Sequence, residues 1–503
     1  MAGITDLPTE ILVNILEHPT FPTESLYFLA LLSRRLHFIA LPIYFSRNGV
    51  DVESATVTLL PHGLDPISAL QISLFVSSME KLTCLLPHPS CTTISPFLTQ
   101  LRRLETFISR LTSIQEVRLD LGSPHGCLST GPDKELEAWS SHFGGLLSCI
   151  VQRGCRALTV TGGTCFINAY ELDDPVSSTK HIRRVIRKML APPVPTVLGF
   201  KRLSKQGKAH HGISLSSMLS TTAEITSLTI DSATLIVPPG LEWTLAALSH
   251  SPITSLSIAM FRVRTPVWPV VLPLIASAAP NITTLSLTHL DVDGESDIIT
   301  FVSQLPHLTH LHLTHHPLWG PRGHQVKSVT LPLWNLVTLR APPNLIEHFL
   351  SRAECCPGIQ SVCVLWAHLN LPLFTRFMSS IIHKLELRRL APQLSLWTES
   401  MSSNMEFNNA LLINVTAART DGFRRVERLD MEETYPLSAH AENIGHLLSL
   451  FSRIKHLSLE IRKEFPETWA VQLTQSVRAT KFLTRMEVNG KIYDLLTSSA
   501  PPA

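Results

Sequence analysis

The 503-residue sequence contains few charged side chains, and neither sign predominates. Charged residues make up 16% of the chain, with 42 Lys and Arg against 40 Asp and Glu. Such a balance produces no general attraction to phosphate-rich polymers or acidic lipid surfaces. We therefore expect neither a membrane nor a nucleic acid to be the partner, and any electrostatic recognition has to come from a local group of residues.

Cysteine pairs and long apolar runs are also missing. The nine cysteines include no Cys-x-x-Cys pair, so neither a disulfide framework nor a zinc site is expected. The longest uncharged stretch, residues 265–290, is interrupted by four prolines, whereas a membrane helix needs about 20 consecutive apolar residues. The first residues lack the basic and apolar regions of a secretory signal. These absences favour a cytoplasmic or nuclear location.

The usual motifs of catalysis are absent as well. The sequence has no phosphate-binding Gly-x-x-x-x-Gly-Lys loop, no Gly-x-Ser-x-Gly elbow and no His-Glu-x-x-His pair. Five histidines lie between positions 307 and 316, but Ser and Thr occupy the matching positions of the neighbouring segments, and a zinc site needs three or four converging ligands. We expect no enzyme activity, no metal and no cofactor.

Residues 1–48 are predicted to form three short helices. Pro8 stands where helices favour proline, and apolar residues follow at helical spacing in the first segment. A second apolar segment covers 26–32, and Ser33 can cap a third helix that runs to about Pro42. A module of this size cannot bury all of its leucines and isoleucines. We expect it to complete its core on a partner or on the rest of the chain.

The order of these residues resembles an F-box, most closely the fungal variety. The resemblance is carried by Leu7-Pro8-x-Glu10-Ile11-Leu12-x-x-Ile15-Leu16, Leu29-Ala30-Leu31-Leu32-Ser33-Arg34-Arg35-Leu36 and Ala40-Leu41-Pro42-Ile43-Tyr44. It implies binding to a Skp-family adaptor and, through that adaptor, to a cullin. The adaptor-facing positions that it implies are Leu7, Pro8, Ile11, Leu12, Ile15, Leu29, Leu32 and Leu36. The alternative is a helical cap that packs on the remaining chain.

One phrase recurs through the rest of the sequence. Ile225-Thr-Ser-Leu228-Thr-Ile230 returns around Leu256, Leu285, Leu311 and Leu339, at intervals of 28, 29, 26 and 28 residues. Further copies are centred on Val117, Leu158, Val362, Leu385, Leu429, Leu457 and Met486. A period near 28 residues, with a short alternating strand and an amphipathic return segment, is typical of leucine-rich repeats.

The predicted fold class is therefore α/β: an all-α module followed by a leucine-rich-repeat solenoid. The boundaries that we predict are 1–48 for the F-box-like module, 49–110 for a helical linker or cap, 111–495 for the solenoid and 496–503 for a flexible tail. Off-period spacings indicate insertions near 165–222 and 391–424. Within the first of these, residues 180–208 are strongly basic and could be a docking segment, a nuclear address or a solvated insertion.

Strand alternation predicts which side chains line the open, concave wall of such a solenoid. Its charged C-terminal half is the predicted target-binding surface, formed by His310, His312, Arg340, Lys384, Glu386, Arg428, Asp430, His456, Arg485 and Glu487. The alternative is that these side chains are merely solvated and that loops bind the target. The function expected from the resemblance is substrate recognition for a cullin-RING ubiquitin ligase, against a leucine-rich-repeat scaffold with no role in ubiquitylation.

Overall fold

A computed structural model of the chain describes nineteen segments of the sequence. They are residues 7–60, 64–87, 95–122, 133–163, 170–172, 200–202, 223–237, 240–259, 267–290, 295–315, 333–351, 355–366, 377, 380–385, 387, 393–400, 427–433, 454–461 and 483–494, with individual side chains described over fewer positions. The chain divides into two compact units, Met1–Asn281 and Ile282–Ala503.

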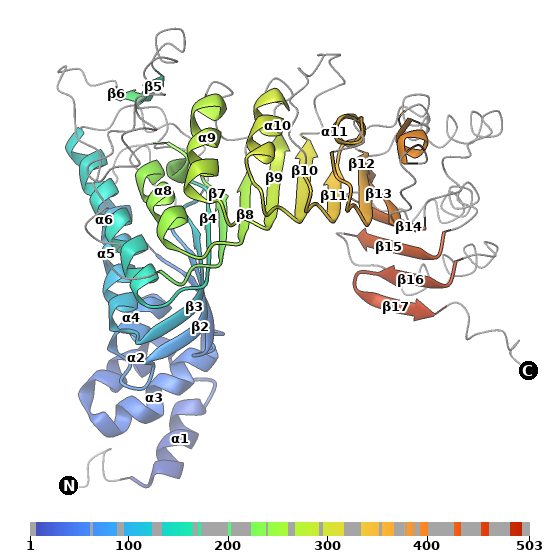
Figure 1. The fold of residues 1–503 in the computed structure, drawn as a ribbon. Coiled ribbons are helices and arrows are strands. Elements are labelled where there is room, and N and C mark those ends of the chain that lie inside the picture. Colours follow the sequence, from blue (N-terminus) through green and yellow to red (C-terminus); the bar gives the residue numbers. More distant parts are fainter. Residues whose placement is uncertain are drawn as a thin grey trace, which may run out of the picture. The chain divides into compact units, whose positions relative to one another are not determined.

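The first unit begins with the three predicted helices, α1 (Thr9–Glu17), α2 (Thr23–Leu32) and α3 (Arg34–Arg47) (Figure 1). Ser33 caps α3 as expected, because its hydroxyl accepts a hydrogen bond from the Leu36 backbone N–H at 3.2 Å. The third helix continues past Pro42, where the sequence predicted an end. Burial of Tyr44 and Phe45 beyond the proline offsets the backbone hydrogen bond that proline cannot donate.

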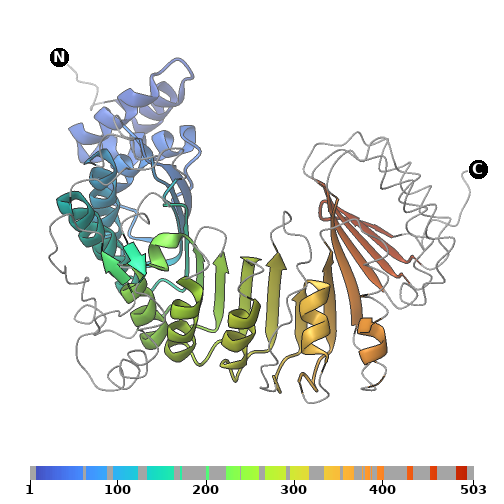
Figure 2. The same cartoon turned by 90° about the horizontal axis from the view of Figure 1, so that it is seen from above.

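A parallel sheet follows in the same unit. Its strands are β1 (Ser54–Thr58), β2 (Ser78–Leu85), β3 (Ser113–Asp120), β4 (Ala157–Thr161), β7 (Ser227–Asp231) and β8 (Ser255–Ala259), in that spatial order. The helices between them are α4 (Pro66–Ile72), α5 (Ser95–Arg110), α6 (Asp133–Gln152), the short η4 (Ala233–Leu235) and α8 (Gly240–His250), and α9 (Trp268–Ala278) comes last. In both views α5, α6, α8 and α9 lie along one face of the sheet (Figures 1 and 2).

The second unit repeats this arrangement. Its strands are β9 (Thr284–Leu290), β10 (His310–His315), β11 (Thr338–Ala341), β12 (Ser361–Trp366), β13 (Gln393–Ser400), β14 (Arg428–Glu433), β15 (His456–Ile461), β16 (Arg485–Val488) and β17 (Lys491–Asp494). Helices α10 (Glu295–Ser303) and α11 (Pro343–Phe349) follow β9 and β11. The strands pair in parallel up to β16, and β17 turns back antiparallel. Asn489 and Gly490, both at positive φ, form the turn that allows this.

The repeated leucines explain why the chain stacks in this way. Leu285, Leu311, Leu339 and Val362 occupy one register position on four adjacent strands, and all four are buried. An α/β repeat cannot bury such residues alone, so each strand depends on its neighbours. The mixed α/β class and the long run of parallel strands are therefore confirmed.

The threonine of the recurring phrase joins consecutive repeats. The Thr309 hydroxyl donates to the Thr283 carbonyl at 2.9 Å, and the Thr484 hydroxyl donates to the Lys455 carbonyl at the same distance. Thr226 makes the equivalent bond to the Arg156 carbonyl at 3.2 Å. Each of these carbonyls also accepts two backbone N–H groups of the next repeat, so the hydroxyl adds a third bond at the entrance to the strand. The threonine in the phrase thus has a structural role that its spacing alone did not reveal.

Three expectations about the repeats need correction. Residues 49–110 contain β1 and β2 besides α4 and α5, so the sheet begins earlier than the predicted linker allowed. The segment around Leu385 is helical over 381–385 and is not a strand. The missing strand is β13, inside the predicted insertion at 391–424. Of the insertion at 165–222, the structure describes the antiparallel pair β5 (Tyr170–Leu172) and β6 (Phe200–Arg202); most of the basic stretch and the tail at 496–503 lie outside the described residues.

The helical module is joined to the sheet through α3. The Phe75 ring lies 6.2 Å from the His37 ring, 6.0 Å from the Phe38 ring and 6.2 Å from the Phe45 ring, measured between centroids. One nitrogen of buried His37, Nε2, accepts the Leu74 backbone N–H at 3.1 Å, and Nδ1 therefore donates to the Ala30 carbonyl, also at 3.1 Å. This contact fixes the histidine tautomer and the position of α3.

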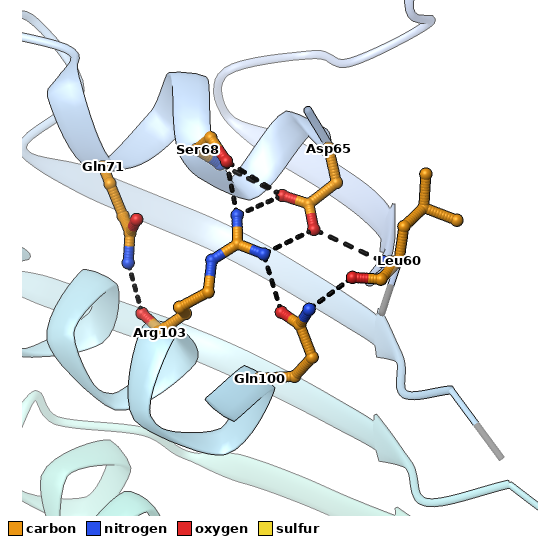
Figure 3. A network of polar contacts seen from close by, with 6 residues as sticks. All are labelled: Leu60, Asp65, Ser68, Gln71, Gln100 and Arg103. Carbon is orange, nitrogen blue, oxygen red and sulfur yellow. Dashed lines mark hydrogen bonds and ion pairs between the residues drawn. The ribbon is translucent and has the colours of Figure 1, made fainter. Parts of the chain in front are cut away.

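A buried polar network joins neighbouring elements of the same unit (Figure 3). The Arg103 guanidinium donates to both carboxylate oxygens of Asp65, at 2.7 and 3.0 Å, and the Asp65 side chain has no exposed surface. Asp65 also caps α4 by accepting the Ser68 backbone N–H at 3.2 Å, and Gln100 donates to the Leu60 carbonyl. The network thus connects the end of β1 with α4 and α5.

Candidate protein-docking surfaces

Helix α1 divides its apolar residues between the core and the surface. Leu12 and Leu16 are buried in the module, whereas Ile11 and Ile15, four residues apart, are 45% and 41% exposed. Residues at this spacing lie on one side of a helix. The exposed side of α1 therefore carries two large aliphatic side chains that the described chain covers only in part.

Helix α2 presents a second apolar stripe. Leu26 and Ala30 are buried, while Phe28, Leu31 and Leu32 are 56%, 54% and 70% exposed. The three exposed residues fall at positions i, i+3 and i+4, so they share one side of α2. Exposure of this extent on adjacent turns is unusual for a surface that faces only water.

The apolar exposure is concentrated in the first 38 residues. Eleven large hydrophobic side chains are exposed among the described residues, and six of them lie in this module. Those six are Ile11, Ile15, Phe28, Leu31, Leu32 and Phe38. We call them the apolar set.

Arginine side chains hold the helices that carry the apolar set. Arg47, in the last turn of α3, donates to the backbone carbonyls of Leu16, His18 and Phe21, and so binds the end of α1 and the following turn. Arg35 donates to the Leu7 carbonyl at 2.6 Å and thereby fixes the start of α1. Because these contacts use backbone acceptors, they set helix positions without covering the exposed apolar side chains.

The sequence-predicted adaptor residues separate into two groups. Pro8, Ile11, Ile15 and Leu32 are exposed, and Leu7 and Leu29 are partly exposed. The assignment of Leu12 and Leu36 has to be corrected, because both side chains are buried in the module and cannot reach a partner.

Sequence analysis did not select Phe28, Leu31 or Phe38. The helical spacing of Phe28 with Leu31 and Leu32 was the signal that could have identified α2 as a docking face.

The second candidate surface is a line of side chains across the strands of the second unit. Strand pairing places one residue from each of β9 to β16 at a common register position. In spatial order these are Ser286, His312, Arg340, Cys363, Ser395, Arg428, His456 and Arg485. We call this line the polar row. It lies on the opposite face of its strands from the buried leucines, since side chains alternate along a strand.

Most residues of the predicted target-binding wall lie in or beside the polar row. On the same strand face, His310 lies two residues to the N-terminal side of the row, and Asp430 and Glu487 lie two residues to its C-terminal side. Lys384 must be removed from the wall, because it belongs to a helical segment and its ammonium group lies 3.3 Å from the Glu347 carboxylate. Glu386 lies outside the described residues. Cys363 and Ser395 take the corresponding places in the row.

Within the row, His312 is kept neutral by its surroundings. Desolvation and then the positive charge of Arg340 lower the pKa of His312 to about 4. Its Nδ1 lies 3.4 Å from the Ser286 hydroxyl, and its Nε2 is buried without a hydrogen-bond partner. Protonation would place a second positive charge beside Arg340, so the neutral form is favoured in the folded protein.

Acidification should therefore weaken folding through His312. An unfolded histidine has a pKa near 6.5, so below that pH the unfolded chain binds a proton that folded His312 accepts only near pH 4. We expect this residue to reduce the free energy of unfolding by roughly 2 kcal/mol between pH 7 and pH 5. Urea unfolding of the wild type and of His312→Gln at both pH values measures the effect. An equal pH dependence in the two proteins would contradict it.

Near the other end of the row, Arg428 is paired with an acidic side chain, whereas His456 lies beside one without forming an ion pair. The Arg428 Nε donates to the two carboxylate oxygens of Asp430 at 2.9 and 3.0 Å. His456 Nε2 lies 3.8 Å from a Glu487 carboxylate oxygen. Desolvation, Arg428 and Arg485 lower the pKa of His456 against the opposing effect of Asp430 and Glu487. His456 is consequently neutral at pH 7, and its contact with Glu487 is not an ion pair there.

Metal-holding groups and membrane-spanning helices are both absent from the residues that the structure describes. Across the described ranges, no three His, Cys, Asp or Glu side chains gather in a group that could hold a metal ion. None of the helices that the structure describes combines the length and the apolar character that crossing a bilayer requires.

Comparisons with known proteins add little. The sequence matches no described protein family and no curated protein. Among solved structures, a protein of Bacteroides fragilis is similar over 63% of this chain and 82% of its own, with 11% sequence identity and a TM-score of 0.31.

Proposed function

We propose that this protein is the substrate-recognition subunit of a cullin-RING ubiquitin ligase of the SCF type. In this proposal, α1 and α2 bind a Skp-family adaptor, which connects the chain to a cullin. The face of the repeat sheet that carries the polar row binds the target protein. The chain itself performs no chemistry, and the location of such a complex is the cytoplasm or the nucleus.

The observation that carries the proposal is the apolar set. Its members lie within the segment that resembles an F-box, and Ile11, Ile15 and Leu32 are among the positions that the resemblance assigns to the adaptor. Complete burial of a large apolar side chain stabilises an interface by about 1.5–3 kcal/mol. The four aliphatic and two aromatic side chains of the apolar set are 41–70% exposed, and covering their exposed parts is a substantial driving force for binding another protein.

The proposed mechanism is one of proximity. A target held on the sheet and an adaptor held on α1 and α2 belong to one assembly, so target lysines stay near the ubiquitin-transferring subunits at a high effective concentration. Binding on two separate elements also explains why the chain needs no catalytic motif of its own.

The rival function is a repeat scaffold without a role in ubiquitylation, in which the N-terminal helices serve as a cap. The packing of Phe38 and Phe45 against Phe75 favours this reading, because a cap needs that contact. A cap, however, gives no reason for the exposure of Phe28, Leu31 and Leu32 on α2.

Titration calorimetry with a purified Skp-family adaptor decides between the two. The ligase proposal predicts one-to-one binding with a Kd of about 1 μM or tighter, equivalent to roughly −8 kcal/mol. The heat-capacity change should be negative, as expected for the burial of apolar surface. Absence of binding to the full chain would leave the scaffold as the better account.

A further inference from the structure

The polar row contains three arginines at fixed separations. Strand order puts three strand spacings between Arg340 and Arg428 and two between Arg428 and Arg485. At about 4.8 Å per spacing, these separations are roughly 14 and 10 Å. An extended peptide advances about 3.4 Å per residue, so the two distances correspond to about four and three residues of an extended segment laid across the strands.

We propose that the polar row binds an extended acidic segment of a partner protein, with carboxylate side chains at Arg340, Arg428 and Arg485. This acidic segment would belong to the target of the proposed function. Only the result of binding, ubiquitylation of that target, rests on the proposed function. The binding itself does not depend on the adaptor.

Charge distribution on the sheet favours this ligand. The polar row contains three arginines and no acid, while the next position on the same face of β14 and β16, two residues further along the strand, is occupied by Asp430 and Glu487. Carboxylates on a ligand are therefore attracted to the row itself and repelled from the positions on its C-terminal side. This restricts an acidic segment to a path across the strands.

Asp430 also prepares Arg428 for such a ligand. Its carboxylate holds the Arg428 Nε, and the Arg428 side chain remains 43% exposed. An arginine that is already oriented loses less conformational entropy when it binds a carboxylate. The same arrangement disfavours a nucleic acid, because the continuous phosphate charge of a strand would lie beside Asp430 and Glu487.

The middle of the row carries no exposed side chain. Cys363 and Ser395, which separate Arg340 from Arg428, are only 8% and 7% exposed. They cannot contact a peptide themselves, so a ligand in this part of the row is held only through the arginines on either side.

Fluorescence anisotropy with the full chain and a labelled decaglutamate peptide tests the inference. Arg428→Glu/Arg485→Glu is the main variant, and the matched control is Arg156→Glu, an exposed arginine on the first unit with a 3.8 Å contact to Glu224. We expect salt-dependent binding that weakens at least tenfold in the double variant and less than twofold in the control.

Circular dichroism establishes whether each variant folds. If the double variant does not, Arg485→Glu, at an exposed position, should weaken binding about threefold.

Adaptor binding, measured on the same variants, separates this inference from the proposed function. Decaglutamate binding that is unchanged in the arginine variants, or equally weakened in the control, overturns the acidic-segment inference. So does tighter binding of a ten-nucleotide thymidine strand than of decaglutamate. Such results with adaptor binding intact leave the proposed function standing. If the chain does not bind the adaptor but binds decaglutamate through these arginines, the proposed function is overturned and the acidic-segment inference stands.

Discussion

Replacing Ile11, Ile15 and Leu32 by aspartate should weaken adaptor binding by at least about a hundredfold, or roughly 3 kcal/mol. All three side chains are exposed in the free chain, so the new carboxylates stay hydrated until the adaptor binds. In the complex they would enter an apolar contact and lose water without gaining a partner, which is the source of the cost. Calorimetric titration of the triple variant against a Skp-family adaptor measures it.

The triple variant should remain folded, because substitutions at exposed positions change the free energy of unfolding by about 0.5 kcal/mol each or less. Ile492→Asp is the matched control, since Ile492 is a 54% exposed aliphatic residue on β17, outside the apolar set. Its adaptor affinity should equal that of the wild type. Leu12→Asp cannot serve as a test, because Leu12 is buried and its replacement would unfold the module. Equal adaptor affinity of the triple variant and the wild type would contradict docking through α1 and α2.

Replacing Arg103 by alanine should reduce the free energy of unfolding by about 3–5 kcal/mol. The substitution leaves the Asp65 carboxylate buried without its positive partner and without the two hydrogen bonds from Arg103, and only neutral donors of Leu60 and Ser68 remain. Urea unfolding followed by circular dichroism measures the loss. Hydrogen exchange at the amides of α4 and α5 should show that these helices open first, because the network in Figure 3 joins them.

Two further variants separate this effect from the general loss of an ion pair. Asp65→Ala/Arg103→Ala removes both charges and should be more stable than the sum of the single substitutions implies. Lys81→Ala breaks the 2.8 Å pair with Glu116, whose side chains are 47% and 42% exposed, and should cost less than about 1 kcal/mol. A loss at Arg103 no larger than the loss at Lys81 would show that the network is not an important support.

Loss of the network should also affect adaptor binding indirectly. Helix α4, whose first turn Asp65 caps, contacts α3. Helix α3 in turn positions α1 through Arg35 and Arg47. The docking surface therefore depends on contacts some distance from the residues that would meet the adaptor.

The amino-acid sequence by itself determined where most elements lie. Helical spacing around Ile11, and the recurring phrase around Leu228, correctly predicted a helix and a stack of parallel strands. These patterns are reliable because the period of apolar residues follows directly from the geometry of a helix or a strand. The same alternation correctly placed Arg340 and Arg428 on the polar face of their strands.

Only the tertiary structure decided between alternatives that share one local pattern. The run from 381 to 385, with buried Ile381, Ile382 and Leu385, fits a helix as well as a strand, and β13 rather than this run pairs with β12. Packing of α1 against α3 likewise decided that Leu12 is buried and Ile11 exposed. Which residues stand side by side in the polar row depends on strand register, a property of pairs of strands that no single repeat contains.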